Sequence, residues 1–101
     1  MAESKLVRDR IPEIIKKKGG RPVTHIAKKD EYWQKLKEKL EEEIEEFAEE
    51  PTEEELADIL EVIDAIIDFR KIDRSKLRKI KADKAKKRGK FAKKIILDDV
   101  K

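Results

Sequence analysis

The stretch EEIEEFAEEPTEEELAD, residues 42–58, decides the fold of this chain. Pro51 interrupts it, and a helix that precedes a proline ends at or before the residue in front of it, here Glu50. Thr52, followed three residues later by Glu55, matches a capping box and predicts the start of a second helix. The turn between the two helices then has only one or two residues. Such a short turn predicts an antiparallel helix hairpin.

Apolar residues at helical spacing extend both arms of this hairpin. The stripe of the first arm consists of Trp33, Leu36, Leu40, Ile44 and Phe47. The stripe of the second arm consists of Leu56, Ile59, Leu60, Ile63 and Ile67. Asp30 is the predicted N-cap of the first arm, because its short side chain can accept a hydrogen bond from a free backbone N–H of the first turn.

A short helix is predicted before the hairpin, over residues 11–18. Apolar residues recur there at helical spacing, and the two glycines at 19–20 end the pattern. The apolar run within residues 21–27 is too short for more than an extended connector. We therefore expect one helix and one connector ahead of the first arm.

A fourth helix is predicted after the hairpin, with Asp73 or Ser75 as its N-cap. It runs to Arg88, where Gly89 is the expected C-terminal stop. Residues 91–97 then form an apolar, extended tail. The predicted fold is all-α, an antiparallel helix-hairpin bundle of four helices.

Composition indicates one small domain with a thin core. A chain of 101 residues matches a single domain, residues 1–101, by its length. Half of the residues are charged and 38% are hydrophobic, below the usual apolar share of about 45–50%. Small domains often gain core by association, so we expect a homodimer or a higher homo-oligomer.

Several classes of protein are excluded or disfavoured. The chain has no cysteine, which removes disulfides, thiolate nucleophiles and zinc–sulfur sites, and the single His25 excludes a multi-histidine metal site. No apolar run approaches the roughly 20 residues of a membrane span, and the N-terminus lacks the apolar part of a secretory signal. We expect a soluble, cytoplasmic protein. Abundant lysine and glutamate, with no asparagine, resemble the composition of thermophile proteins.

Four acids share one margin of the predicted hairpin. At about 100° per residue, Glu43 lies ~60° and Glu46 ~120° from the centre of the first apolar stripe. Glu55 and Asp58 lie ~70° and ~130° from the centre of the second stripe, again on one margin. Like charges ~4 Å apart repel by about 4 kcal/mol at an effective dielectric near 20. A hard divalent cation such as Mg²⁺ relieves this repulsion.

Each acid also has a purely structural interpretation. Glu55 closes a capping box in one reading, and the helix dipole favours any acid at Asp58. Glu42 and Glu46 are alternatively ion-pair partners of Lys39. Glu43 is the hardest to explain this way, because an unpaired carboxylate that points toward a core is costly.

Other residues that bind nucleotides in some proteins have simpler roles here. Trp33 and Tyr32 are able to stack on a base, but the apolar stripe predicts core packing for Trp33. His25 is expected on the surface of the connector. Lys84 and Arg88 form a basic ridge that suits a polyphosphate, although a solvated lysine-rich helix is the commoner meaning.

The acids form a known pattern together with the two ends of the chain. EExxE at residues 42–46, followed by ExxD at 55–58, resembles the signature of the all-α nucleoside triphosphate pyrophosphohydrolases, the MazG-like and phosphoribosyl-ATP pyrophosphohydrolase-like superfamily. KLVRDRIPEII at residues 5–15 and RGKF at 88–91 are similar to a small archaeal and bacterial subgroup of it. The chain departs from that subgroup at Lys90, where a second glycine is expected, and in the charged residues after Ile67.

The resemblance implies hydrolysis between the α- and β-phosphates, which releases a nucleoside monophosphate and pyrophosphate, often to clear noncanonical nucleotides. It assigns the Mg²⁺ ligands to Glu43, Glu46, Glu55 and Asp58. It makes Glu42 a candidate general base. Charge on the phosphates is then neutralised by Lys5, Arg8, Lys84 and Arg88.

Two alternatives stay open at this point. Within the enzyme class, the narrower one is hydrolysis of phosphoribosyl-ATP in histidine biosynthesis. In a different class, the basic stretch at residues 70–94 predicts a helical module that binds nucleic acid. The net charge of only +3 and the acidic middle of the chain make nucleic acid the less favoured partner.

Overall fold

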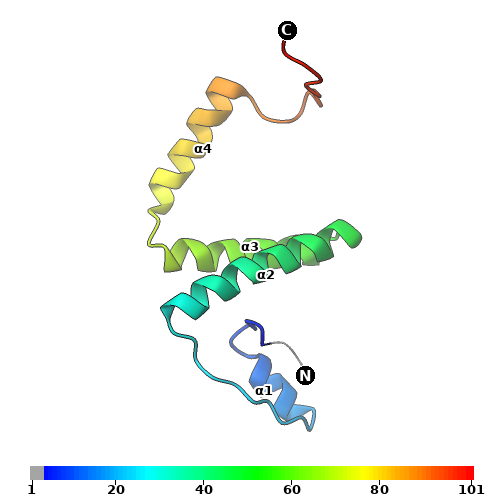
Figure 1. The fold of residues 1–101 in the computed structure, drawn as a ribbon, viewed down its shortest axis with the longest axis vertical. Helices are drawn as coiled ribbons and strands as arrows, with labels where there is room; N and C mark the ends of the chain where they lie inside the picture. The colour runs from blue at the N-terminus through cyan, green and yellow to red at the C-terminus, as the bar shows by residue number, and fades with distance from the viewer. Residues whose placement is uncertain (1–3) are drawn as a thin grey trace.

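The computed structural model describes residues 4–101, which form four α-helices and no strand (Figure 1). The helices are α1 (Ile11–Lys17), α2 (Lys29–Glu49), α3 (Glu53–Phe69) and α4 (Arg74–Arg88). The prediction of an all-α fold with four helices is confirmed for these residues. No helix in this part of the chain is both long and apolar enough to cross a membrane.

Helices α2 and α3 lie side by side and antiparallel, joined by residues 50–52 (Figure 1). The Thr52 hydroxyl caps α3 and accepts a hydrogen bond from the Glu55 backbone N–H at 3.2 Å. The reciprocal bond of a capping box is not formed, because the Thr52 N–H donates to the Glu50 carbonyl at 2.7 Å. The hairpin prediction is confirmed, and the Glu55 carboxylate is not used by the cap.

The start of α2 differs from the prediction at Asp30. Lys28 is the cap residue, with an extended backbone, and its carbonyl accepts from the Tyr32 N–H at 2.8 Å. No side chain caps this end. Asp30 lies in the first turn with Glu31, where the helix dipole stabilises acids without a capping hydrogen bond.

The other helix ends follow the predicted signals. Gly19, just beyond α1, has φ +88°, and a Cβ at Gly20 would lie 2.5 Å from the Ile15 side chain. Glycine therefore follows α1, because a side chain does not fit at Gly20.

The start of α4 also follows the predicted signal. Asp73 is its N-cap and accepts hydrogen bonds from the Ser75 and Lys76 N–H groups at 2.8 and 3.1 Å.

The core of the hairpin is small. Its buried apolar side chains are Leu36, Val62 and Ile67. At the open end of the hairpin Trp33 stacks on Phe69, with ring centroids 5.9 Å apart, and Tyr32 meets the same ring edge-on at 5.1 Å. The predicted packing role of Trp33 is confirmed.

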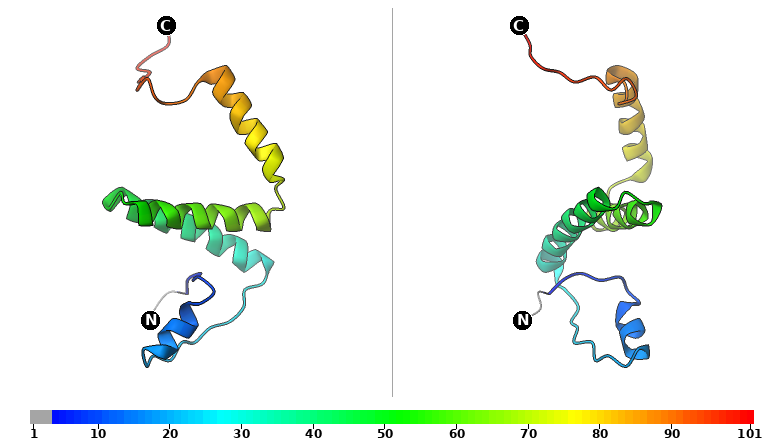
Figure 2. Two further views of the ribbon diagram at one scale, coloured as in Figure 1. Left: turned by 180° about the vertical axis from the view of Figure 1, so that it is seen from behind. Right: turned by 90° about the vertical axis from the view of Figure 1, so that its right-hand side faces the viewer.

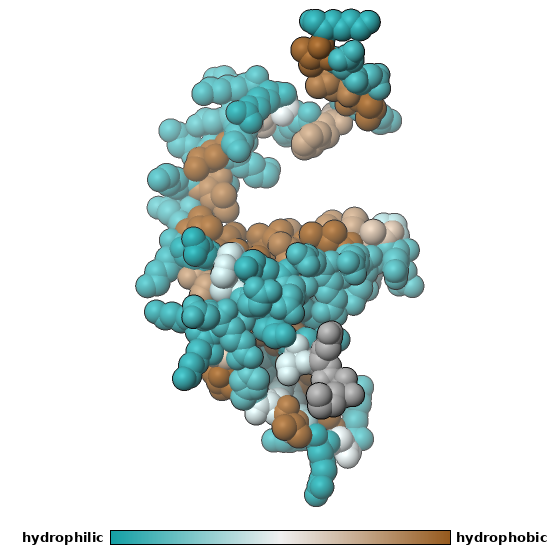
Figure 3. Space-filling view, in the orientation of Figure 1, coloured by the Kyte–Doolittle hydropathy of each residue, from teal (hydrophilic) through white to brown (hydrophobic). Residues whose placement is uncertain are grey.

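A long apolar face of the hairpin has no cover within the described residues. It consists of Ile44, Leu56, Leu60 and Ile63. Figure 3 shows it as a brown band along the edge of the hairpin that faces α4. Helix α4 leaves the hairpin instead of packing on it, and the tail beyond it is exposed (Figures 1 and 2). The radius of gyration is 18.2 Å, against about 13 Å for a compact chain of this length.

The segment of residues 4–10 and helix α1 lie on the opposite side of the hairpin from α4 (Figure 2). We call residues 4–10 the N-terminal strap. The Ser4 carbonyl of the strap accepts a hydrogen bond from Lys35 Nζ on α2 at 2.8 Å. The strap thus lies against α2.

Candidate metal centre

Glu43, in the middle of α2, points into the hairpin and is only 5% exposed. Its Oε1 lies 3.2 Å from Lys39 Nζ, one turn earlier. Its Oε2 is buried and has no hydrogen-bond partner among the described residues. An unsatisfied buried polar atom destabilises a fold by about 1–3 kcal/mol, and more when it is charged. The inward orientation predicted for Glu43 is confirmed.

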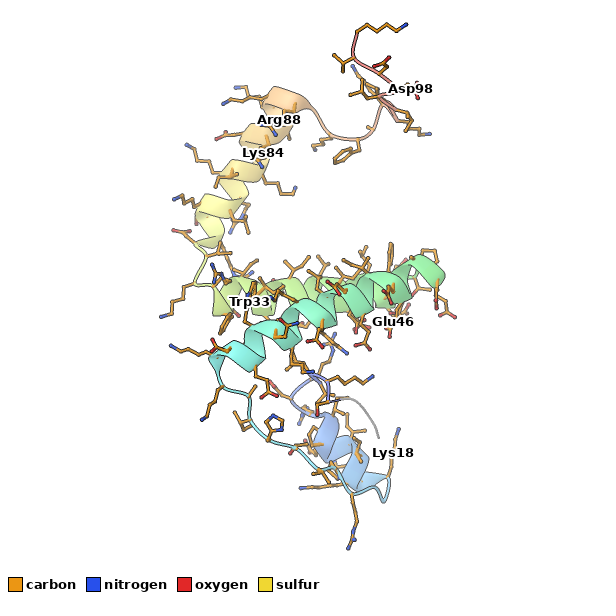
Figure 4. All side chains as sticks on the ribbon, in the orientation of Figure 1. Lys18, Trp33, Glu46, Lys84, Arg88 and Asp98 are labelled. Atoms are coloured by element: carbon orange, nitrogen blue, oxygen red, sulfur yellow. The ribbon has the colours of Figure 1, made fainter. Side chains whose placement is uncertain are left out.

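Two groups of acids meet at Glu43. Carboxylate oxygens of Glu42, Glu43 and Glu46 come within 4.8 Å of one another, and so do those of Glu43, Glu55 and Asp58. The first group lies on α2, and the second joins α2 to α3. Glu46 marks this margin of the hairpin in Figure 4. The structure therefore brings all five predicted acids to one place, with Glu43 shared.

A second carboxylate oxygen of the cluster is also buried without a partner, Oε2 of Glu55. This oxygen comes from α3, whereas the unsatisfied oxygen of Glu43 comes from α2. Both side chains belong to the same group of three acids. Each of the two helices thus contributes one carboxylate with an unsatisfied buried oxygen to this group of acids.

Repulsion within the cluster raises the pKa of Glu46 above its ordinary value. The main cause is the charge of Glu43, followed by desolvation, with smaller effects from Glu55 and Glu42. A raised pKa shows that the ionised form is disfavoured where it stands. A bound cation reverses this preference.

Three cations among residues 4–101 contact the cluster. Lys5 Nζ lies 3.5 Å from Glu42 Oε1, Arg8 donates to Asp58 Oδ1 at 2.7 Å, and Lys39 contacts Glu43. These three positive charges face the five carboxylates of the cluster, and Glu61 lies beside Arg8 as well, so acids outnumber cations at the site. A divalent cation reduces this excess of negative charge.

The sequence did not indicate the partners of two residues at the site. The structural interpretation of the acids paired Lys39 with Glu42 and Glu46, whereas Lys39 contacts Glu42 at 3.7 Å and Glu43 at 3.2 Å. The i, i+4 spacing of Lys39 and Glu43 was a readable signal for this pair. Glu61, 4.0 Å from Arg8, had no such signal because the two are far apart in sequence.

Lys84 and Arg88 are not brought to the acids. Both lie on α4, which stands on the other side of the hairpin (Figure 4). His25 is exposed, as predicted, and bonds to Glu31 at 2.8 Å. In the part of the chain that the structure describes, the cations of the site come from the strap and α2.

A cavity of about 770 Å³ lies between the strap, α1 and the hairpin. Its charged lining includes Lys5, Arg8, Lys39, Glu43 and Asp58. Its apolar lining includes Ile11, Ile14, Leu36, Val62 and Ala65, together with Tyr32. Of the five acids, Glu43 and Asp58 line this space together with the basic side chains of Lys5, Arg8 and Lys39. Its volume is in the range that small ligands occupy.

The donor set suits a hard cation. Its atoms are carboxylate oxygens, two of them buried without partners, and hard divalent ions such as Mg²⁺ prefer oxygen ligands. The chemistry open to the site is binding of such an ion beside an anionic ligand. No protein-family model, no curated protein and no solved structure matches this chain.

Proposed function

We propose that this protein is a Mg²⁺-dependent nucleoside triphosphate pyrophosphohydrolase. It cleaves between the α- and β-phosphates and releases a nucleoside monophosphate and pyrophosphate. One observation supports this above the others: Glu43 is buried with one oxygen unsatisfied, at the point shared by two groups of acids. The resemblance of the acidic motifs to pyrophosphohydrolases agrees with it.

The metal ligands in this proposal are Glu43, Glu46, Glu55 and Asp58. When bound, Mg²⁺ supplies positive charge that stabilises negative charge developing on the phosphate oxygens. Lys5, Arg8 and Lys39 add positive charge at the same cavity, where a triphosphate is neutralised.

Glu42 is the proposed general base. It is half-buried, and its two oxygens face Lys5 and Lys39 at 3.5 and 3.7 Å. It takes a proton from the water that attacks the α-phosphorus. The bond from that phosphorus to the bridging oxygen breaks, and pyrophosphate leaves with the electron pair. Glu42 lies on α2 within about one turn of the ligands Glu43 and Glu46, whereas Glu55 and Asp58 come from α3.

We also propose a homodimer formed through the uncovered apolar face. That face lies on the side of the hairpin toward α4, whereas the strap and α1, which line the cavity, lie on the other side (Figures 1 and 3). A second copy therefore completes the core without covering the cavity. Contacts of Lys84 and Arg88 with phosphate stay a prediction, because within one chain both residues lie on the other side of the hairpin from the acids (Figure 4).

The test is a product analysis. Purified protein and Mg²⁺ are incubated with a panel of canonical and noncanonical nucleoside triphosphates and with phosphoribosyl-ATP. We expect pyrophosphate and the monophosphate, not orthophosphate. Preference for phosphoribosyl-ATP selects the histidine-pathway alternative, whereas no pyrophosphate from any substrate contradicts the proposal.

Helix α4 supports one second candidate, the binding of nucleic acid. Its exposed cations are Arg74, Lys76, Arg78, Lys79, Lys81, Lys84, Lys86, Lys87 and Arg88. Within residues 4–101 only Arg74 of this set forms an ion pair, with Asp64 and Asp68. Duplex DNA binding that weakens steeply with salt would favour this candidate. Retention of that binding by Glu43→Gln would separate it from the enzyme.

A further inference from the structure

The strap connects the acid cluster to the start of the chain through two ion pairs. Lys5 reaches Glu42 on α2 at 3.5 Å, and Arg8 reaches Asp58 on α3 at 2.7 Å. The Arg8 contact is the shorter one and joins residues 50 positions apart. Charged hydrogen bonds of this length are about twice as strong as neutral ones. Arg8 thus holds an acid that the proposed metal centre also requires.

Arg8 and Lys39 differ in how far their side chains are exposed to solvent. The Lys39 side chain is 20% exposed and stays against the buried Glu43. The Arg8 side chain is 56% exposed and lines the cavity beside the acids. A guanidinium at hydrogen-bond distance from Asp58 repels a dication that binds the same carboxylate. Of the two, Arg8 is free to move away from that dication.

We propose that Arg8 is an exchangeable counter-ion of the centre, an inference that rests on the function proposed above. In the metal-free protein Arg8 pairs with Asp58. When the acids hold a divalent ion, Arg8 leaves Asp58 and pairs with the phosphate chain of the ligand in the same cavity. Arg8 is therefore a positioning residue that couples metal loading to phosphate binding.

The proposed exchange predicts whether removal of Arg8 strengthens or weakens metal binding. If Arg8 and the metal compete for Asp58, removal of Arg8 tightens metal binding. If Arg8 instead serves as a fixed partner that orients Asp58, its removal weakens metal binding by about 10- to 100-fold, as loss of outer partners does. The two roles predict opposite changes in one dissociation constant.

The experiment titrates the full-length, metal-free protein with Mn²⁺ and follows free Mn²⁺ by electron paramagnetic resonance. We expect Arg8→Gln to lower the Kd for Mn²⁺ by about fivefold or more, and Arg8→Lys to stay near the wild type. Arg10→Gln is the matched control, because Arg10 belongs to the strap but pairs with Glu13, at 3.6 Å. It should leave the Kd unchanged.

A second measurement needs no variant. Mg²⁺ is added to wild-type protein, and exchange of the Arg8 Nη–H protons, which bond to Asp58, with water is followed by NMR. Release from Asp58 should speed this exchange. The third arm uses the Mn²⁺ complex of inorganic tripolyphosphate at saturating Mn²⁺. Arg8→Gln should weaken its binding by about tenfold, in the range of allosteric coupling between two ligands.

Equal or weaker Mn²⁺ binding by folded Arg8→Gln overturns the exchange, and so does unchanged Arg8 exchange on adding Mg²⁺. Wild-type protein that binds no Mn²⁺ overturns both the exchange and the proposed enzyme. Tighter binding by Arg8→Gln, with no pyrophosphate released from any nucleotide, supports the exchange and contradicts the enzyme alone.

Discussion

Lys39 and Glu43 lie one turn apart on α2, and Lys39 Nζ reaches only one of the two carboxylate oxygens, at 3.2 Å from Oε1. The other oxygen is buried and unsatisfied among the described residues. Oε1 of Glu43 thus has an ion-pair partner, whereas Oε2 has no partner within residues 4–101. A bound cation would interact with a lone pair of Oε2 and satisfy this atom.

Replacement of Glu43 by glutamine should abolish metal-dependent chemistry while keeping the fold. We expect pyrophosphate release to fall at least about 100-fold, the upper range for loss of outer-sphere partners. Initial rates with Mg²⁺ and circular dichroism measure the two effects. Glu49→Gln, an exposed acid near the end of the same helix, is the control. Normal hydrolysis by Glu43→Gln would show that the ligands are misassigned.

Removal of Lys39 should destabilise the hairpin. Lys39→Met leaves the Glu43 charge buried without a partner, and we expect a loss of about 2–3 kcal/mol in unfolding free energy, below the range for fully buried pairs because Lys39 is partly exposed. Urea unfolding in EDTA measures this. The double variant with Glu43→Gln should recover most of the loss. A loss of less than about 0.5 kcal/mol in Lys39→Met would mean that the pair is dispensable.

The pKa of Glu46 should lie above its ordinary value in the metal-free protein, because Glu43 is close. The folded chain then holds this proton to higher pH than the unfolded chain does. The group therefore opposes folding above its folded pKa, and this effect fades as the pH falls through that pKa. Carboxyl ¹³C titration should show the pKa falling in Glu43→Gln. An unchanged pKa would remove Glu43 as the cause.

Variants of Thr52 and Glu55 should distinguish helix capping from metal binding. Thr52→Ala loses the hydrogen bond to the Glu55 N–H and should reduce stability by about 1 kcal/mol, with Mn²⁺ affinity unchanged. Glu55→Gln should not reduce stability, because it removes one of several like charges in the cluster, and it should weaken Mn²⁺ binding. Urea unfolding and Mn²⁺ titration of both variants test this. The reverse pattern would make Glu55 a capping residue only.

The apolar face should mediate association. Leu60 is 56% exposed on α3, and Leu60→Glu should convert the proposed dimer to monomers because a charge in an apolar interface is costly. Sedimentation equilibrium measures the mass. Ile26→Glu is the control, since Ile26 is exposed in the connector, away from this face. A wild-type protein that sediments as a monomer would contradict the dimer.

Local signals in the sequence were sufficient for the hairpin and for part of the site. Pro51 and the Thr52 cap act within a few residues, so the turn was readable. The helical period alone placed Glu43 on the inward side. The cap at Asp30 was wrong because Lys28 already has the extended backbone of a cap, and neighbouring residues compete for that position.

Contacts between distant segments were not readable. The Arg8–Asp58 pair joins residues 50 positions apart, and its formation depends on the path of the strap across the hairpin. The direction of α4 depends on the short link after α3, where Lys71 has φ +54°. The spacing of apolar residues predicts neither the course of the strap nor the direction of α4. The predicted meeting of Lys84 and Arg88 with the acids therefore had no local support.

The small core of Leu36, Val62 and Ile67 has a consequence for every comparison of variants. In the proposed dimer, folding and association form one equilibrium, so the melting temperature rises with protein concentration. A variant with weaker pairing then loses turnover on dilution even if its chemistry is intact. Rates of two variants are comparable only at concentrations where both are fully assembled.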